Sequence, residues 1–226
     1  MAVKKRQKLN IYLFRHGETY YNKKGIFTGR KDVKLSSLGL KQAKKIAKEL
    51  KNKKIDIAFQ TSLSRSKDTL KEVLKYHPEC KKIVTNDLMI ERSYGDLEGT
   101  YHADFIKKAG NQKINLLTQG NYFENFSLHL KKKIGNFLGK KEYDLIHRGY
   151  SIKPLKGESL EMVEKRVAKF IEKLKQMMKE EKINAAISAH GNSIRMFRKI
   201  MEKASIKKSS KWFIPYDKVY HYILNT

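Results

Sequence analysis

A histidine near the start of the chain follows directly after a short apolar run, in the sequence IYLFRHGET that begins at Ile11. A run rich in β-branched and aromatic residues that breaks into Arg, His and Gly predicts a buried strand that ends at His16. A neutral imidazole can attack phosphorus, and Arg15 supplies a fixed positive charge beside it. These two residues suit covalent phosphoryl transfer, although a turn after a strand is the simpler interpretation until other motifs are counted.

A second histidine repeats this arrangement near the end of the chain. The apolar run at residues 183–189 breaks into His190 and Gly191. The helix predicted to follow them has an apolar face made of Ile194, Phe197 and Met201. Two histidines at the ends of strands can meet if the strands are neighbours in a parallel sheet, because their carboxyl ends then share one edge. The sequence therefore predicts that His16 and His190 belong to one site.

Two more charged residues stand where predicted strands end. Arg65 falls in the first turn of a helix, where the helix dipole disfavours a cation. We expect Arg65 to bind an anion together with the helix N-terminus, with an ordinary surface arginine as the alternative. Glu91 ends the apolar segment at 83–90 and precedes a tight turn, so it is a candidate general acid or base. A solvated glutamate in a turn is the alternative.

These side chains need a framework, and strands and helices do alternate along the chain. Strands are predicted at residues 11–14, 55–61 and 183–189, with a short strand or strand pair at 83–90 and a last edge strand at 219–224. One of the two serines, Ser36 or Ser37, is predicted to cap a helix whose apolar face comprises Leu40, Ala43, Ile46, Ala47 and Leu50. We therefore predict an α/β fold: a three-layer sandwich with a mostly parallel central sheet flanked by helices.

The middle of the chain is less regular. Helical stretches are expected from about residue 101 to residue 141, interrupted by Gly110, Gly120, Gly135 and Gly139. We interpret this part as a helical insertion over the site, within a single domain that spans residues 1–226. An irregular loop is predicted at residues 143–154, with basic side chains at His147, Arg148 and Lys153.

The composition fits one large domain with a strong positive charge. The chain has 226 residues, 40% of them hydrophobic, and 50 Lys and Arg against 23 Asp and Glu give a formal net charge of +27. Such a charge attracts nucleic acid, anionic membranes or small polyanions. The lysines are spread in ones and twos along predicted helices, with Lys131, Lys132 and Lys133 as the longest run. This pattern favours solvated helix faces over a specific nucleic-acid surface.

The sequence also bears on the compartment. Cys80 is the only cysteine, so an intrachain disulfide is excluded and a reducing compartment is expected. The apolar run near the N-terminus is too short for a secretory signal, and no segment approaches the length of a membrane span. We therefore expect a soluble cytoplasmic protein with no membrane partner. Homo-oligomerisation is left open.

Six motifs, in this order, resemble those of the histidine phosphatase superfamily. They are Arg-His-Gly-Glu at 15–18, Thr-Gly at 28–29, Thr-Ser-x-x-Arg at 61–65, Glu-Arg-x-Tyr-Gly at 91–95, Gly-Glu-Ser at 157–159 and Ala-His-Gly-Asn-Ser-x-Arg at 189–195. Within that superfamily they look most like the 2,3-bisphosphoglycerate-dependent phosphoglycerate mutases. The resemblance runs from about residue 11 to residue 224 and is poor at 101–141.

The resemblance implies a role for each motif residue. His16 is then the phosphorylated nucleophile, Arg15, Arg65 and His190 hold the transferred phosphoryl group, and Glu91 gives and takes the proton. The implied substrate-binding residues are Asn22, Thr28, Gly29, Arg92, Tyr94, His102, His147, Arg148, Gly191 and Asn192. Arginine and histidine supply the positive charge that a phosphoryl group in flight needs, so no metal is expected. The implied substrate is a small phosphorylated acid of glycolysis and gluconeogenesis, with 2,3-bisphosphoglycerate as phosphoryl primer.

The sequence departs from the mutase pattern in three places. His102 stands where these mutases carry a lysine, and His147 and Arg148 stand where they carry paired arginines. The chain also ends at Thr226, just after the last predicted strand, whereas many such mutases have a tail that covers the site. A weaker grip and a more open site would favour a metal-independent phosphatase that acts on small phosphomonoesters. If the two histidines help to hold the substrate, affinity for 3-phosphoglycerate should rise as the pH falls from about 8 to about 6.

A third interpretation is a basic binding protein built on an inactive phosphatase fold. His16, Arg65, Glu91 and His190 are all retained, and a binding protein has no need of all four. We therefore favour an enzyme, with the mutase preferred over the phosphatase.

Overall fold

Strands β1 (Lys8–Arg15) and β4 (Ala185–Ala189) lie side by side near the middle of the sheet in the computed structural model, which describes residues 7–120, 123 and 125–225. They are parallel, and Arg15 pairs with Ala189 at the last position of each strand. The N–H of His16 donates to the carbonyl of Ala189 at 3.0 Å. His16 and His190 therefore leave the sheet at the same edge, as the sequence predicts.

The other three strands complete a mostly parallel sheet. β2 (Ile57–Gln60) pairs with β4, and β3 (Lys82–Thr85) pairs with β2, both in the parallel sense. β5 (Val219–Asn225) runs antiparallel to β1, so the strand order is β3-β2-β4-β1-β5. The segment at 83–90 contributes one strand, followed by the short 3-10 helix η1 (Asp87–Met89).

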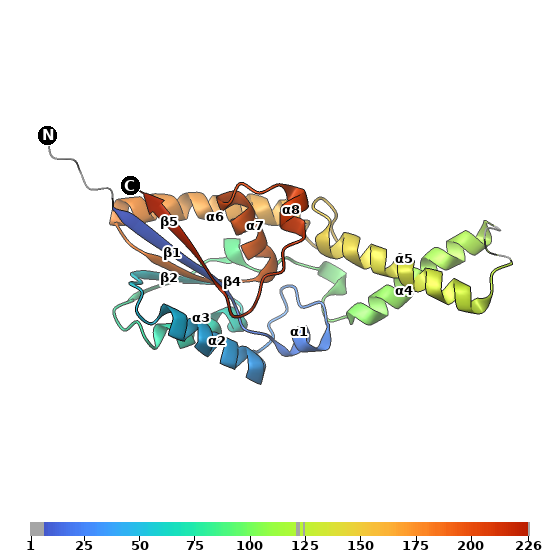
Figure 1. The fold of residues 1–226 in the computed structure, drawn as a ribbon, viewed down its shortest axis with the longest axis horizontal. Helices are drawn as coiled ribbons and strands as arrows, with labels where there is room; N and C mark the ends of the chain where they lie inside the picture. Colours follow the sequence, from blue (N-terminus) through green and yellow to red (C-terminus); the bar gives the residue numbers. More distant parts are fainter. Residues whose placement is uncertain (1–6, 121–122, 124, 226) are drawn as a thin grey trace.

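Helices cover both faces of the sheet, which confirms the predicted three layers. Figure 1 shows α6 (Leu160–Glu181) and α7 (Gly191–Met201) on one side and α2 (Ser37–Leu50) and α3 (Ser64–Leu74) on the other. Alternate β1 residues enter separate cores, because successive strand side chains point to opposite faces. Leu9, Ile11 and Leu13 pack with α6 and α7, whereas Tyr12 and Phe14 pack with α2 and α3.

The prediction for the apolar face of α2 is wrong at one residue, Leu40. Ser36 caps the helix, and the other four predicted residues are buried, but Leu40 is 39% exposed. The first turn of α2 packs through Gly39, where a Cβ atom would come within 2.0 Å of the backbone oxygen of Glu18. Leu40, one residue further round the helix, consequently points away from the sheet.

The middle of the chain folds as two long helices, α4 (His102–Gln119) and α5 (Leu128–Arg148). The two helices pack on each other and extend away from the sheet (Figure 1), and together they are called the hairpin below. Three of the four glycines expected to interrupt the helices lie inside them instead, because they allow the backbones to touch. A Cβ atom on Gly110 would lie 2.1 Å from the oxygen of Gly135, and one on Gly139 would lie 2.0 Å from that of Ile106.

The irregular loop predicted at 143–154 also needs correction, since residues 143–148 are the last turns of α5. Only the base of the hairpin, which includes His102 and His147, reaches the pocket described below. The remaining short elements are α1 (Tyr20–Lys24), η2 (Gly95–Leu97) and α8 (Ile206–Ser210). No helix within the described part of the chain combines the length and apolarity needed to cross a membrane.

Candidate active site

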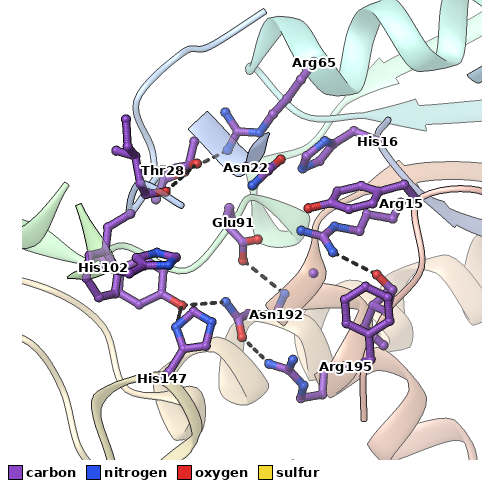
Figure 2. Close-up of a pocket in the computed structure, with 18 of the residues that line it drawn as sticks. Arg15, His16, Asn22, Thr28, Arg65, Glu91, His102, His147, Asn192 and Arg195 are labelled. Carbon is purple, nitrogen blue, oxygen red and sulfur yellow. Dashed lines mark hydrogen bonds between the residues drawn. The ribbon is translucent and has the colours of Figure 1, made fainter. Parts of the chain in front are cut away.

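A pocket of about 190 Å³ opens where β1 and β4 end. This is below the roughly 300–1,000 Å³ of pockets for drug-sized ligands, so it suits a small molecule. Figure 2 shows residues that converge on the pocket from the edge of the sheet, from α1 and the segment after it, from α7, and from the ends of α4 and α5 nearest the sheet. The predicted site residues that line it are Arg15, His16, Asn22, Thr28, Gly29, Arg65, Glu91, Tyr94, His102, His147, Arg148, Gly191 and Asn192.

His16 is held as a neutral imidazole. Its Nδ1 lies 2.7 Å from the carbonyl oxygen of Gly17. A carbonyl can only accept, so Nδ1 carries the proton and Nε2 keeps its lone pair. Burial, followed by the charges of Arg65 and Arg15, lowers the pKa of His16 well below 6.5. Gly17 is required here because a Cβ atom would lie 2.1 Å from the oxygen of Gly39.

Arg15 and Arg65 supply positive charge next to His16. Arg65 is 1% exposed, and its two terminal nitrogens donate to the carbonyls of Lys31 and Gly29 at 2.8 and 2.7 Å. Arg15 donates to the carbonyl of Ile214 at 2.8 Å. The Nε atoms of both arginines are buried without a partner, and neither arginine pairs with a carboxylate among the described residues. Burial lowers the pKa of Arg65 to about 10, so it remains charged at pH 7.

The ring of His190 lies next to that of His16, with the two ring centroids 5.0 Å apart, but His190 is fully buried and is not among the residues that line the pocket. Its Nε2 lies 2.8 Å from the hydroxyl of Thr61, the residue that follows β2. Its Nδ1 is buried with no partner. Burial, followed by the nearby Arg65, lowers the pKa of His190 well below 6.5. Two partly unsatisfied arginines and this histidine together form a site for a tetrahedral anion beside Nε2 of His16.

Glu91 is placed by backbone hydrogen bonds. Its Oε1 accepts from the N–H groups of Arg92 and Asn192, at 2.8 and 3.1 Å. Figure 2 shows its carboxylate between the group around His16 and the side chain of Asn192. A carboxylate fixed in this position, and 7% exposed, can exchange a proton with a substrate hydroxyl next to the phosphoryl site.

A second pair of arginines, Arg148 and Arg195, also lines the pocket. Arg148, at the end of α5, donates to the carbonyl of Trp212 at 3.2 Å, and Arg195 donates to the same oxygen at 3.3 and 3.1 Å. Arg195 also donates to Oδ1 of Asn192. Burial and the charge of Arg148 lower the pKa of Arg195 to about 10. Neither arginine has a carboxylate partner in the described part of the chain, so this pair can accept a second anion.

Arg195 lines the pocket but is not among the sequence-predicted binding residues. A weaker form of the signal that singles out Arg65 applies to it, because Arg195 stands in the second turn of α7, the helix that follows His190. Phe213, Ile214 and Tyr216 line the pocket as well. They come from a loop just before β5 that carries no motif, so the sequence offered no comparable signal for them.

The two histidines of the expected substrate grip sit in an aromatic cluster. The ring of His147 stacks on Tyr94 and Tyr143, with centroids 5.6 and 5.0 Å away, and Nδ1 of His147 lies 3.0 Å from the hydroxyl of Tyr94. The ring of His102 packs on Phe27 at 4.4 Å. Burial lowers the pKa of both histidines, and in His147 the neighbouring Arg148 lowers it further, to well below 6.5.

Among the predicted substrate-binding residues, Arg92 is the one that the structure places elsewhere. It is fully buried, and its guanidinium donates to three backbone carbonyls, those of Glu158, Ile146 and Ile152, at 2.7–3.0 Å. These bonds tie the end of α5 to the loop that precedes α6. Arg92 therefore fixes the base of the hairpin and does not line the pocket.

Asn22 and Thr28 reach the pocket from the segment after β1. Oδ1 of Asn22 accepts from the backbone and hydroxyl of Thr19, at 3.1 and 2.8 Å, which holds the asparagine in a capping box at the start of α1. No group of three or more His, Cys, Asp or Glu side chains that could hold a metal ion occurs within the described residues.

Comparisons with known proteins agree with this geometry. The family model for the histidine phosphatase superfamily (branch 1) matches residues 11–126 and 132–225. A 2,3-bisphosphoglycerate-dependent phosphoglycerate mutase from Buchnera aphidicola is 32% identical over 211 residues, which cover 91% of this chain and 89% of that protein. A protein of the same name from Parvibaculum lavamentivorans is 30% identical over 200 residues, covering 86% and 80%.

Solved structures with the same fold include proteins named as phosphoglycerate mutases and proteins named as phosphatases. Phosphoglycerate mutase from Bacillus anthracis superposes with a TM-score of 0.68 at 19% identity, over 97% of this chain and 89% of that one. A mycobacterial glucosyl-3-phosphoglycerate phosphatase with VO3 also gives 0.68, at 17% identity, over 96% and 97%.

The sheet, its flanking helices and the histidines at its edge define a protein of the phosphoglycerate mutase-like fold. Because the family model matches nearly its whole length, the chain belongs to the histidine phosphatase superfamily. It is an enzyme of that superfamily, either a mutase or a phosphatase.

Proposed function

We propose that the chain is a phosphoglycerate mutase that interconverts 3-phosphoglycerate and 2-phosphoglycerate through a phosphohistidine on His16. The observation that carries the proposal is a second pair of arginines, Arg148 and Arg195, which line the pocket in addition to Arg15 and Arg65 and share the carbonyl oxygen of Trp212. A mutase must hold the rest of the substrate while the phosphoryl group moves between two hydroxyls. The names of the curated relatives support the same assignment.

In the proposed reaction, phosphorylated His16 gives its phosphoryl group to the free hydroxyl of a phosphoglycerate. Glu91 takes the hydroxyl proton as the new O–P bond forms and the N–P bond breaks. Arg15, Arg65 and His190 hold the three equatorial oxygens of the group in flight. The bisphosphorylated intermediate then turns, and Nε2 of His16 attacks its other phosphoryl group while Glu91 returns the proton to the departing oxygen.

Turning without release requires a grip that does not depend on the reacting phosphoryl group. Arg148 and Arg195 are permanent cations that can bind a carboxylate or a second phosphate in the fork geometry typical of guanidinium groups. The proposal includes 2,3-bisphosphoglycerate as the primer that first phosphorylates His16. It includes no metal ion, because arginine and histidine supply the charge that a metal would bring.

A phosphatase is the second candidate, and a specific observation favours it. His102 and His147 stand where the mutase pattern has cations, yet burial lowers the pKa of each, so they add little positive charge near pH 7. The second grip then rests on two arginines alone. If water replaces the substrate hydroxyl next to Glu91, the same residues hydrolyse the phosphohistidine.

A steady-state assay separates the two candidates. Purified protein should convert 3-phosphoglycerate to 2-phosphoglycerate, and 2,3-bisphosphoglycerate should stimulate the conversion, with little inorganic phosphate released. EDTA should leave the rate unchanged, and His16→Ala should have no activity. Hydrolysis of simple phosphomonoesters without any stimulated mutation would assign the chain to the phosphatases instead.

A further inference from the structure

The loop between α8 and β5 supplies backbone carbonyls to arginines at both ends of the pocket. The carbonyl oxygen of Ile214 accepts a hydrogen bond of 2.8 Å from Arg15, next to His16. The carbonyl oxygen of Trp212 accepts a hydrogen bond of 3.2 Å from Arg148 and two of 3.3 and 3.1 Å from Arg195. One oxygen atom therefore orients two guanidinium groups that come from different elements, α5 and α7.

The ring of Trp212 lies outside the pocket and is held by a stack of planar groups. Cζ of Arg198 is 4.1 Å from the Trp212 ring centroid and 4.5 Å from that of Tyr220. Glu202 fixes the guanidinium from one turn further along α7, with N–O distances of 2.9 and 3.2 Å. The hydroxyl of Tyr222 on β5 donates to the same carboxylate at 2.8 Å. The Trp212 ring is thus attached to both α7 and the edge strand.

This arrangement has a geometric consequence for the second arginine pair. Arg195 and Arg198 lie one turn apart on α7, so the stack on Arg198 sets where the Trp212 carbonyl sits relative to Arg195. Arg148 shares that oxygen, although it belongs to the hairpin. Arg148 and Arg195 carry like charges, and no carboxylate within the described residues pairs with either one. Without the shared oxygen, the two guanidinium groups would therefore move apart.

We propose that Trp212 and Arg198 are positioning residues that aim Arg148 and Arg195 at the part of the substrate remote from His16. The inference rests on the proposed function, because it assumes a substrate with a second anionic group. Neither residue touches the substrate. Their effect should therefore appear in the affinity for ligands that carry two anionic groups and be absent for a ligand that occupies the phosphoryl site alone.

Isothermal titration calorimetry on the unphosphorylated protein tests this with two probes, 3-phosphoglycerate and inorganic phosphate. Trp212→Ala should raise the dissociation constant of 3-phosphoglycerate about tenfold, between the effects of an exposed and of a fully desolvated cation–π contact, and leave that of phosphate unchanged. Trp212→Phe keeps a ring over Arg198 and should bind both probes like the wild type. Arg198→Gln keeps the aliphatic stem without the planar cation and should show the same split as Trp212→Ala.

Tyr76→Ala is the matched control, because it removes another aromatic ring that faces a cation, Lys51 at 5.7 Å, far from the pocket. It should change neither dissociation constant. Equal weakening of both probes by Trp212→Ala and Arg198→Gln would indicate general damage and overturn the inference, as would no change in either. If the two variants show the split but the wild type has no mutase activity, the proposed function is refuted and the positioning role stands.

Discussion

The Nε2 atom of His16 can attack phosphorus at neutral pH only while the ring is unprotonated. Burial and two neighbouring arginines provide that condition by lowering its pKa, and the carbonyl of Gly17 selects the tautomer that leaves Nε2 free. The same arginines then face the incoming anion. In the proposed reaction, a single arrangement of charges therefore both keeps His16 unprotonated and binds the phosphoryl group that it attacks.

Glu91 should affect turnover far more than phosphate binding, because in the proposed reaction its carboxylate moves a proton and does not bind the phosphoryl oxygens. Glu91→Gln keeps the size of the side chain and should lower kcat by about 10²–10⁴-fold. The inhibition constant of inorganic phosphate should change little. Arg65→Ala is the comparison, since it should raise that constant strongly. Equal effects of Glu91→Gln on kcat and on phosphate inhibition would place Glu91 in the binding shell.

The pH dependence expected from the sequence changes once the surroundings of His147 are known. Its pKa lies well below 6.5, because the ring is buried and Arg148 is adjacent, so it stays neutral between about pH 8 and pH 6. His147→Gln should then bind 3-phosphoglycerate with the same pH profile as the wild type. The ratio of the two dissociation constants cancels the titration of the ligand itself. A wild type that gains affinity over the variant as the pH falls to about 6 would show that His147 does protonate.

At the residue level, the sequence was informative wherever a side chain ends a strand. His16, Glu91 and His190 could be singled out because an apolar run breaks at each of them. Arg92 could not be placed correctly, because a motif gives a residue type and not the direction of its side chain. Its guanidinium turns inward to three carbonyls that only the folded chain brings together.

At the level of elements, the strands and the helices that cover the sheet were predictable from their apolar periodicity. The hairpin was harder, because α4 and α5 pack mainly on each other and bury few apolar side chains. Their contact relies on glycines, which in isolation indicate breaks in a helix. Residues 143–148 were predicted as loop for a different reason, since their inward-facing groups are aromatic and imidazole rings and not an aliphatic stripe.

The glycine contact in the hairpin can be tested by adding one methyl group. Gly139→Ala should lower the free energy of unfolding by about 1–3 kcal/mol, because its Cβ atom has no room beside the backbone of Ile106. It should also raise KM for 3-phosphoglycerate, since α4 and α5 carry His102 and His147 at the pocket wall. Lys140→Ala, at the exposed neighbouring position, is the control for urea unfolding and kinetics. Equal stability of the two variants would mean that the helices can separate without strain.

For the whole molecule, the parallel pairing of β1 with β4 is the feature that creates the site, and the two histidine motifs were enough to expect it. The full strand order and the route of the loop before β5 follow from packing between distant segments, which local patterns do not encode. The net charge of +27 fits an enzyme of anionic substrates, since a positive field raises the rate at which such substrates arrive.

The central claim is that the phosphoryl group on His16 passes to a substrate hydroxyl and not to water. Protein treated with ³²P-labelled 2,3-bisphosphoglycerate, freed of excess label and then given 3-phosphoglycerate, tests this claim directly. We expect an acid-labile, alkali-stable label on the wild type, none on His16→Ala, and transfer of the label into bisphosphoglycerate and phosphoglycerate. Label that persists on His16→Ala, or that leaves the wild type mainly as inorganic phosphate in the presence of 3-phosphoglycerate, would contradict the account.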